Sequence, residues 1–462
     1  MLLRRLLALS AVAVLAACPE PKPAAPPAEA QDAGQPSRTV TVLVTGHESG
    51  ELPLRGARLL DAWRKDEGWP NVIALSTGDM FSGNAISTHF DGQPTAEAMK
   101  AMQYRAAALG NHDIDLGIDV LKSFVKTSGL ALLAANLREK DSKRAPLPGH
   151  VILERGGVKV GVVGLTSEKT LYTTEPGRAD QYELAPPGLV LSSALAAARQ
   201  DGAEALVVIL DDCFSTVQPL FTAHPEWNVD AVVGGRCEGP QESAVGKTSF
   251  YSIGDDLSAY VSVRIEVPAS GDHVVKTARK AVSAEGGEDA DLVALRTRWQ
   301  ERLKAMLGQV IGYTTKGYPE DAKELRLLVA TALRDETKAD AALVNLKGVR
   351  AGLKPGPITR ESVYSMIPFE NAVLTVKVKG EVLLKMKSLP EAFFLMPKGK
   401  VEPDKDYVLA TTEYLYFGGD GLGFEPAAPN PELTGQVWQT PVVAWIARQG
   451  TTEKKPLEKL LK

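Results

Sequence analysis

Apolar runs that are short and rich in Val, Ile, Leu and Ala alternate with amphipathic stretches over the first half of the chain. Each run is bounded by Gly, Pro or polar residues, which is the pattern of a buried β-strand. Several of the intervening stretches repeat apolar residues at helical spacing. This alternation favours an α/β domain. It predicts strands at 39–45, 72–76, 106–109, 130–136, 158–165, 205–210 and 230–234, and helices at 54–63, 119–125 and 189–199.

The pattern changes in two places. The paired glycines Gly156 and Gly157, between two apolar runs, predict a hairpin turn, so part of a sheet is expected to be antiparallel. A periodic apolar run at 292–307 predicts one long helix that links two domains. A second unit is expected from about Val310, with a helix at 325–333 and several strands.

Length and charge narrow the class of protein. A chain of 462 residues predicts two or three domains. Hydrophobic residues at 44% and charged residues at 24% are ordinary values for a globular protein. The net charge is −5 and no long run of Lys and Arg occurs, so we expect no nucleic-acid partner.

The N-terminus has the pattern of an export signal. Two arginines at positions 4 and 5 precede an apolar run at 6–15 that is too short to span a bilayer. Small residues then precede Cys18, and this ending resembles the bacterial lipobox, in which the cysteine is lipidated. Ordinary cleavage with soluble secretion is the alternative.

These features predict a lipoprotein signal peptide at 1–18 and a Pro/Ala-rich tether at 19–38. Because Pro19 rather than Asp follows Cys18, sorting to the outer membrane is favoured. We therefore expect the protein on the periplasmic side of a bacterial membrane, with a lipid anchor at Cys18.

Polar residues with catalytic potential gather in two loops that follow predicted strands. The first loop contains Gly78 and Asp79, and the second runs from Gly110 through Asn111 and His112. Loops past the carboxyl ends of strands are where α/β domains place their sites. Asp, Asn and His would supply a bridging carboxylate, a neutral oxygen and an imidazole.

This pair of loops resembles the Gly-Asp … Gly-Asn-His-[Asp/Glu] core of the calcineurin-like metallophosphatases. Three later segments, at 345–350, 367–371 and 418–421, resemble the Asn-x-Gly-Gly-[Ile/Val]-Arg, Pro-Phe-x-Asn and Gly-Gly-Asp-Gly segments of the bacterial 5'-nucleotidase/UDP-sugar hydrolase family. The order of the segments also agrees with that family. The resemblance covers nearly everything from Thr39 onward.

The resemblance implies a fold and an activity. It implies a metallophosphatase α/β sandwich at 39–270, a linker with a long helix at 271–309, and a smaller α+β C-terminal substrate-binding domain at 310–462. It also implies hydrolysis of nucleotides or related phosphate esters by divalent metals that activate a water. A monomer is expected. The alternative is a catalytically inactive lipoprotein of the same fold that binds a nucleotide or a cell-envelope partner, and a transport or structural lipoprotein is a third class.

The family pattern assigns roles to four residues. Asp79 would bridge two metals and Asn111 would bind one of them. His112 and Asp115 would form the imidazole/carboxylate pair that stabilises charge developing on phosphate.

Other ligand positions depart from the pattern. His47 stands where the family has Asp, and Ser49 stands where it has His. After the strand at 205–210 the family has a His, where we place Asp212. The last loop, which is Gly-His-x-[His/Gln] in the family, here contains Arg236 and Glu238.

The remaining candidate ligands are His47, Asp79, Asn111, Asp212 and Glu238, a mixed oxygen and imidazole set that favours Mg or Mn over Zn. One or two divalent ions in a rebuilt site, or none, remain open. Arg236 cannot coordinate, because guanidinium stays protonated. Either Arg236 replaces a metal electrostatically and still holds a phosphate, or the site is inactive and Arg236 pairs with Asp79 or Asp212.

Two cysteines neighbour these positions. Cys213 follows Asp212 and Cys237 follows Arg236, in two loops that the family fold brings side by side. The residues leave three states open: a disulfide, thiolate ligation of a metal, or two buried free thiols.

The second domain supplies the candidate substrate contacts. Phe369 and Tyr414 are candidates to sandwich a base, or else are core aromatics. Asp420 would accept hydrogen bonds from base or ribose, or else belongs to a simple turn. By the resemblance, the full set is Asn345, Arg350, Phe369, Asn371, Tyr414 and Asp420.

Overall fold

The computed structural model describes residues 37–462 apart from 82, 116, 175–177, 254–256, 370, 390, 423, 425–426 and 462. Residues Ser37–Lys462 form one compact unit. The predicted signal peptide, the lipidation site Cys18 and nearly all of the tether lie outside the described residues.

The first sheet has six strands in the order β14-β13-β1-β2-β3-β4. Strands β1 to β4 run parallel. Strand β13 pairs antiparallel with β1, and β14 pairs antiparallel with β13 at the edge of the sheet. The strands are β1 (Arg38–Thr45), β2 (Ile73–Ser76), β3 (Tyr104–Ala108), β4 (Ala131–Leu133), β13 (Ala259–Val267) and β14 (Val274–Ala281).

The second sheet also has six strands, in the order β11-β12-β10-β9-β7-β6. Strand β6 pairs antiparallel with β7 across Gly156 and Gly157, which confirms the predicted hairpin. A separate pair joins β5 (Leu137–Glu139) to β8 (Tyr182–Leu184). The strands of the sheet are β6 (His150–Arg155), β7 (Val158–Leu165), β9 (Ala205–Leu210), β10 (Ala231–Gly234), β11 (Glu242–Val245) and β12 (Thr248–Ser252).

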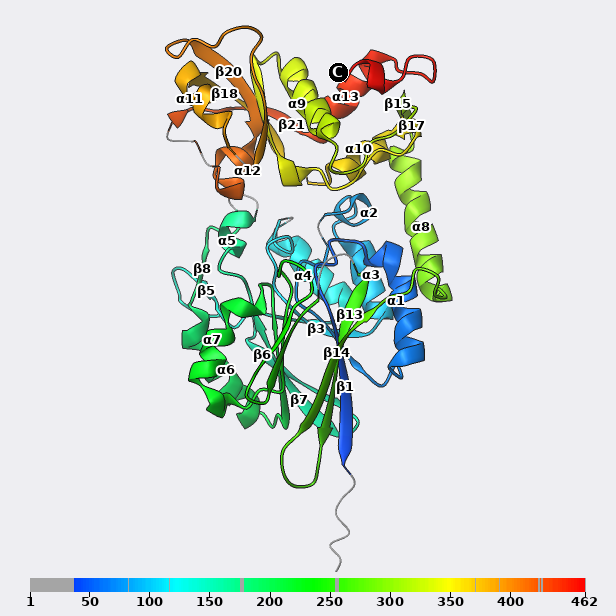
Figure 1. Ribbon diagram of the computed structural model, residues 1–462, viewed down its shortest axis with the longest axis vertical. Coiled ribbons are helices and arrows are strands. Elements are labelled where there is room, and N and C mark those ends of the chain that lie inside the picture. Colours follow the sequence, from blue (N-terminus) through cyan, green and yellow to red (C-terminus); the bar gives the residue numbers. More distant parts are fainter. Residues whose placement is uncertain are drawn as a thin grey trace, which may run out of the picture. The chain divides into compact units, whose positions relative to one another are not determined.

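The two sheets pack face to face. Their facing side chains, such as Val42 and Val44 on β1 and Val207 and Ile209 on β9, form one apolar core. The opposite faces are covered by helices, so central strands such as β2, β9 and β10 are buried on both sides and are apolar runs rather than alternating ones. The helices are α1 (Leu52–Asp66), α3 (Gln93–Ala101), α4 (Ile118–Ser128) and α8 (Ala290–Leu307) on the first sheet, and α6 (Pro187–Gln200) and α7 (Gln218–Ala223) on the second (Figure 1).

The predicted linking helix is α8. The side chain of Asp289 accepts hydrogen bonds from the backbone N–H groups of Asp291 and Leu292 and so caps its first turn. Leu292 and Trp299, with other apolar residues at helical spacing, pack in the core that α1 and α3 share. The helix therefore belongs to the packing of the first domain.

The C-terminal region is a five-stranded sheet in the order β19-β16-β20-β18-β21. Along β16, Ala342 and Val344 enter one core while Ala341 and Leu343 enter another, as expected for side chains that alternate across a strand. The strands are β16 (Ala341–Asn345), β18 (Ala372–Lys379), β19 (Ala392–Leu395), β20 (Asp406–Thr412) and β21 (Glu432–Val437).

Helices cover both faces of this sheet, which confirms a sandwich followed by an α+β domain. Strands β15 (Val310–Thr314) and β17 (Gly356–Thr359) form a separate pair. The helices are α9 (Lys323–Thr337), α10 (Arg360–Met366) and α13 (Gln439–Gln449) with the first core, and α11 (Gly380–Met386) and α12 (Glu413–Tyr416) with the second. Two short helices complete the chain, α2 (Ala85–Thr88) and α5 (Thr170–Thr173). Among the residues that the structure describes, no helix combines the length and hydrophobicity needed to cross a bilayer.

Candidate active site

The candidate site is built from loops at the carboxyl ends of β1, β2, β3, β9 and β10. These strands run parallel within their own sheets, so their ends meet at one edge. The loop after β1 is tied to the loop after β2, because the N–H of His47 donates to the carbonyl of Gly78 at 2.9 Å and that of Ser49 to the carbonyl of Asp79 at 2.9 Å.

Asp79 has a left-handed backbone conformation, with φ of 57°, which is uncommon for a residue with a side chain. The carboxylate of Asp113 holds this conformation, accepting hydrogen bonds from the backbone N–H groups of Asp79 at 3.1 Å, Met80 at 2.7 Å and Gly110 at 2.9 Å. A Cβ on Gly110 would lie 2.1 Å from Asp79 Oδ1, so only glycine fits there. Asp113, for which the sequence analysis proposed no role, therefore joins the loops after β2 and β3.

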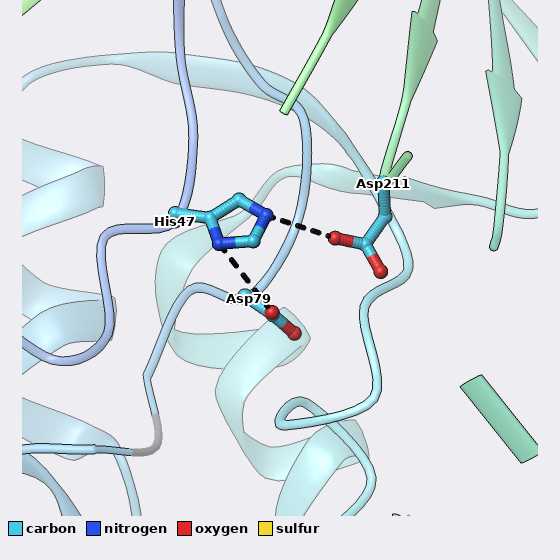
Figure 2. Close-up of side chains that lie close together, drawn as sticks. All are labelled: His47, Asp79 and Asp211. Atoms are coloured by element: carbon cyan, nitrogen blue, oxygen red, sulfur yellow. Dashed lines mark ion pairs between the residues drawn. The ribbon is translucent and has the colours of Figure 1, made fainter. Parts of the chain in front are cut away.

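Two buried carboxylates, those of Asp79 and Asp211, lie on either side of His47. His47 Nδ1 is 3.8 Å from Asp79 Oδ2, and His47 Nε2 is 3.3 Å from Asp211 Oδ1 (Figure 2). Asp79 is 1% exposed and Asp211 is fully buried. The loops after β1, β2 and β9 therefore bring three titratable side chains together.

The ligand position after β9 belongs to Asp211 rather than to Asp212, which corrects the sequence analysis. The carboxylate of Asp212 accepts hydrogen bonds from the hydroxyl of Ser167 at 2.8 Å and from the N–H of Cys213 at 2.8 Å. Successive side chains leave an extended chain on opposite sides, so adjacent aspartates cannot both point into the cluster. The signal in the sequence was the position of Asp211, the first polar residue after the apolar run.

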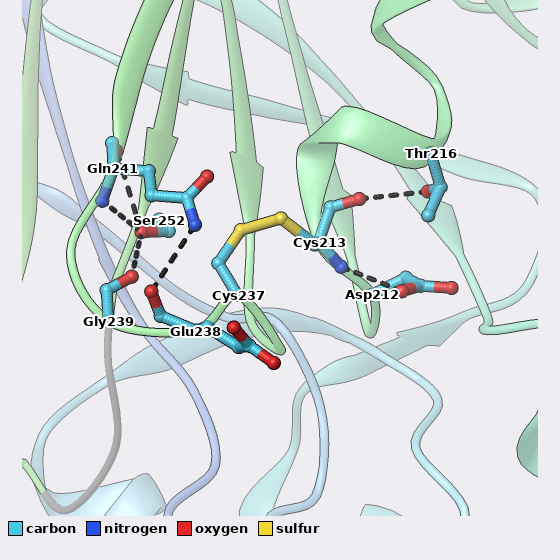
Figure 3. Close-up of a disulfide and its surroundings, with 8 residues drawn as sticks. All are labelled: Asp212, Cys213, Thr216, Cys237, Glu238, Gly239, Gln241 and Ser252. Atoms are coloured by element: carbon cyan, nitrogen blue, oxygen red, sulfur yellow. Dashed lines mark hydrogen bonds between the residues drawn. A yellow bond between two sulfur atoms is a disulfide. The ribbon is translucent and has the colours of Figure 1, made fainter.

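Glu238 is exposed and does not join the cluster, which is a second correction. Its backbone carbonyl accepts a hydrogen bond from the side-chain amide of Gln241 at 3.3 Å, in the loop drawn in Figure 3. The chain turns away from the cluster after Cys237, so the carboxylate is not presented to His47.

Arg236 is the side chain through which the last loop enters the cluster. Its Nε donates to Asp211 Oδ1 at 3.1 Å, and its Nη2 donates to Asp79 Oδ2 and to Asn111 Oδ1. Arg236 thus pairs with Asp79, as one alternative predicted, and with Asp211 in place of Asp212.

These charges change the titration of the cluster. Burial alone would raise the pKa of Asp79, but Arg236, His112 and His47 hold it well below its usual range. Burial and the neighbouring Asp79 raise the pKa of Asp211 to about 6, against the opposing effect of Arg236. Burial would lower the pKa of His47, yet the hydrogen bond to Asp211 and the charge of Asp79 raise it overall.

Cys213 and Cys237 form a disulfide, the first of the three states left open by the sequence (Figure 3). The bond joins the loop that follows β9 to the loop that follows β10. It therefore holds the segment that carries Asp211 against the segment that carries Arg236.

His112 and Asp115 form the predicted pair. His112 Nδ1 lies 2.6 Å from Asp115 Oδ2, and the other carboxylate oxygen accepts a hydrogen bond from the hydroxyl of Thr174 at 2.8 Å. The His112 ring stacks on the ring of Phe369, with centroids 5.3 Å apart and planes at 20°. The imidazole is thus oriented by Asp115 from the first domain and by Phe369 from the C-terminal domain.

A pocket of about 310 Å³ contains most of the candidate residues. The described residues that line it include four Lys or Arg side chains and two Asp side chains, so positive charge predominates. They are Asn111, His112, Asp115, Lys169, Arg236, Asn345, Lys347, Arg350, Phe369, Asn371, Tyr414 and Asp420. The structure therefore brings together all six predicted substrate contacts with His112, Asp115 and Asn111, and it adds Lys169, which the sequence analysis did not single out.

The aromatic and acidic residues of the pocket already contact one another. Arg350 lies over the ring of Phe369 at 5.5 Å from its centroid. The carboxylate of Asp420 accepts hydrogen bonds from the amide of Asn345 at 2.9 Å and from the hydroxyl of Tyr414 at 3.0 Å. A base that stacked on Phe369 would share the ring with His112 and Arg350.

The residues fit one metal ion and not two. One ligand atom each from His47, Asp79 and Asp211 lies within 4.8 Å of the others, and imidazole with carboxylates is a set that divalent ions accept. Asp211 Oδ2 is buried without a hydrogen-bond partner in the described part of the chain, so it offers a lone pair to an ion. Asn111 Oδ1, Asp79 Oδ2 and Asp211 Oδ1 are bonded to the guanidinium of Arg236, so these three oxygens are not open to a second ion.

Comparison with known proteins agrees with this architecture. Residues 310–386 match the family described as "5'-nucleotidase, C-terminal domain". Protein UshA of Escherichia coli is 24% identical, over 88% of this chain and 91% of the relative. Endonuclease YhcR of Bacillus subtilis is also 24% identical, over 68% of this chain, which spans 28% of that relative's length.

The fold has counterparts among solved structures. A 5'-nucleotidase precursor from Thermus thermophilus superposes with a TM-score of 0.73 at 18% identity, covering 90% of this chain and 97% of the other. A likeness at this identity establishes the fold of both domains and leaves the chemistry of the site to be argued from its residues.

Removal of the disulfide should destabilise the protein. A bond that closes a sequence separation of 24 residues restricts the unfolded chain, and the double variant Cys213→Ser/Cys237→Ser should lose about 3 kcal/mol of unfolding free energy. Denaturant unfolding of the variant and the oxidised protein measures the difference. The wild-type protein in reductant is the control and should behave like the variant. Equal stability of variant and oxidised wild type would contradict a formed disulfide.

Proposed function

Because the chain belongs to the 5'-nucleotidase family, with a metallophosphatase domain and a 5'-nucleotidase C-terminal domain, we propose that it hydrolyses nucleotides or related phosphate esters with one divalent metal ion. The observation that carries the proposal is the convergence of the His112–Asp115 pair and four cationic side chains in one pocket. An anionic ester is the ligand that such a lining attracts.

Arg350 is the residue best suited to bind the phosphate. Its guanidinium is half-buried in the pocket and has no carboxylate partner among the described residues. A guanidinium offers a planar fork of N–H donors that matches two phosphate oxygens. Lys169 and Lys347 add positive charge around the same space.

His112 would stabilise charge on the reacting phosphate group. Its Nδ1 is engaged by Asp115 at 2.6 Å, so Nε2 is the ring nitrogen left to donate to a ligand. An N–H donor at this position would hydrogen-bond to the charge that develops on the phosphate group. Phe369 keeps the ring in this orientation by stacking on it.

His47, Asp79 and Asp211 would hold the metal ion. When bound, it would lower the pKa of a water and polarise a phosphoryl oxygen. Mg or Mn suits this oxygen-rich set better than Zn.

The second candidate function is binding of a nucleotide or an envelope partner without turnover. The contacts of Arg236 with Asp79 and Asn111 favour it, because they occupy ligand positions of the family pattern. The two candidates differ in phosphate release and agree in phosphate binding.

Phosphate release from AMP, UDP-glucose and an aryl phosphate tests turnover. Chelator-treated protein should be inactive and should regain activity with Mg or Mn. His112→Asn should lower kcat about a hundredfold, since it removes a donor to the developing charge. Asp79→Asn should abolish metal-dependent activity. A folded, metal-loaded protein that releases no phosphate from any of these esters would exclude hydrolysis and leave the binding function.

Arg350→Gln should weaken substrate binding more than it slows the chemical step. Loss of one charge-assisted interaction is worth about 1.5–3 kcal/mol, which is roughly a 10- to 100-fold rise in KM. The matched control is Lys354→Gln, which removes an exposed charge that does not line the pocket. Equal KM values in the two variants would remove Arg350 from the binding site.

We also propose that the protein is anchored by a lipid at Cys18 on the periplasmic side of a bacterial membrane, with the outer membrane favoured. The lipobox-like sequence supports this, and a disulfide suits an oxidising compartment. Cells fed a labelled fatty acid should label the wild-type protein and not Cys18→Ser, and the variant should leave the membrane fraction. Labelling of Cys18→Ser at the wild-type level would refute the anchor.

A further inference from the structure

We propose that the guanidinium of Arg236 takes the place of one of the two metals that the family fold holds, so that this centre binds one metal ion at most and meets phosphate with a built-in cation. The ligand, a phosphate monoester, is taken from the proposed function, on which this proposal rests. The added claim is that a side chain of the protein, rather than a second metal ion, neutralises the buried carboxylates of the same site.

The partners of Arg236 carry the inference. Asp79, Asn111 and the residue after β9 are all positions at which the family pattern has metal ligands, and each directs an oxygen at this one guanidinium. Arg236 itself stands where the pattern has a ligand His. The guanidinium thus has the ligand environment of an ion, supplied by three separate strand ends.

The contacts exclude a second ion at the same place. A guanidinium carries donors only and stays protonated at any physiological pH. An ion that bound the same oxygens would lie beside a fixed positive charge and would have to displace its hydrogen bonds. The one ion of the proposed function would use oxygens that Arg236 does not engage, such as Asp211 Oδ2.

Arg236 also reaches the ligand space. Its side chain is 24% exposed while those of Asp79 and Asp211 are 2% and 0% exposed. The exposed part lines the pocket together with His112 and Arg350. A phosphate in this pocket would therefore meet the guanidinium directly.

The loop that carries Arg236 is anchored on both sides. Before it, the N–H of Gly235 donates to the carbonyl of Leu210 at 3.1 Å, and a Cβ on Gly235 would lie 2.8 Å from the ring of His47. After it, Cys237 is bonded to Cys213. The backbone on both sides of Arg236 is thus held by the fold itself.

Metal stoichiometry tests the inference without reference to turnover. Mature protein is stripped with chelator, titrated with Mn²⁺ by calorimetry and analysed for bound metal after desalting. Wild type should bind at most one ion per chain. Arg236→His, which restores the ligand type of the family, should bind one more ion than wild type, while Arg236→Lys should not. Lys354→His is the matched control for an added imidazole and should behave like wild type.

Two ions in wild type, or no gain in a folded Arg236→His, would overturn the inference. Zero ions in wild type would support the substitution of a metal by Arg236 and would count against the single metal ion of the proposed function. The failure of the substitution and the failure of the proposed function therefore give different results. Absence of hydrolysis would not alter any of these stoichiometries.

A second measurement covers the case in which Arg236→His does not fold. Inorganic phosphate is titrated into wild type in excess EDTA, and binding should persist because the cation is part of the chain. Arg236→Gln should weaken this binding at least tenfold, with the fold checked by circular dichroism. Phosphate binding that requires added metal, or that is unchanged in Arg236→Gln, would overturn the inference.

Discussion

Two carboxylates held together away from water form the constraint around which this protein is arranged. Asp79 and Asp211 are nearly fully buried and share the same neighbours. Buried like charges are tolerated only when cations accompany them. In this chain Arg236 and His47 fill that role. Burial acts to raise the pKa of both carboxyl groups, and Arg236 opposes that rise, so that the pKa of Asp79 is lowered overall while that of Asp211 stays raised. Arg236 and His47 neutralise part of the negative charge of these carboxylates. The charge that they leave determines whether the site can also bind a metal ion.

The scaffold holds these charges in place through the backbone and through a covalent bond. Asp113 accepts three backbone N–H groups and so holds Asp79 in a left-handed conformation. The disulfide joins the loops that carry Asp211 and Arg236. Such preorganisation matters because an ion pair that reorganised on ligand binding would lose part of the binding energy.

The C-terminal domain completes the pocket and sets what it can recognise. Phe369 stacks on His112, and Arg350 lies over the same aromatic ring. These contacts couple the orientation of the imidazole to a residue that lines the pocket. In the proposed function, phosphate recognition would be supplied mostly by fixed cations of the chain, and the metal would act beside them.

The sequence by itself determined the alternation of strands and helices in the first half and the hairpin at Gly156 and Gly157, because apolar periodicity and glycine turns are local signals. The type of each domain and the predicted substrate contacts followed from the resemblance of its motifs to a family, and Lys169 of the pocket was not predicted. Only the tertiary structure decided that Asp211 and not Asp212 enters the cluster, that Glu238 turns away, and that the two cysteines pair. It also decided that Arg236 lies among three oxygen ligands. These outcomes depend on which side of a strand end each side chain leaves and on how loops distant in sequence pack, and neither is encoded in local pattern.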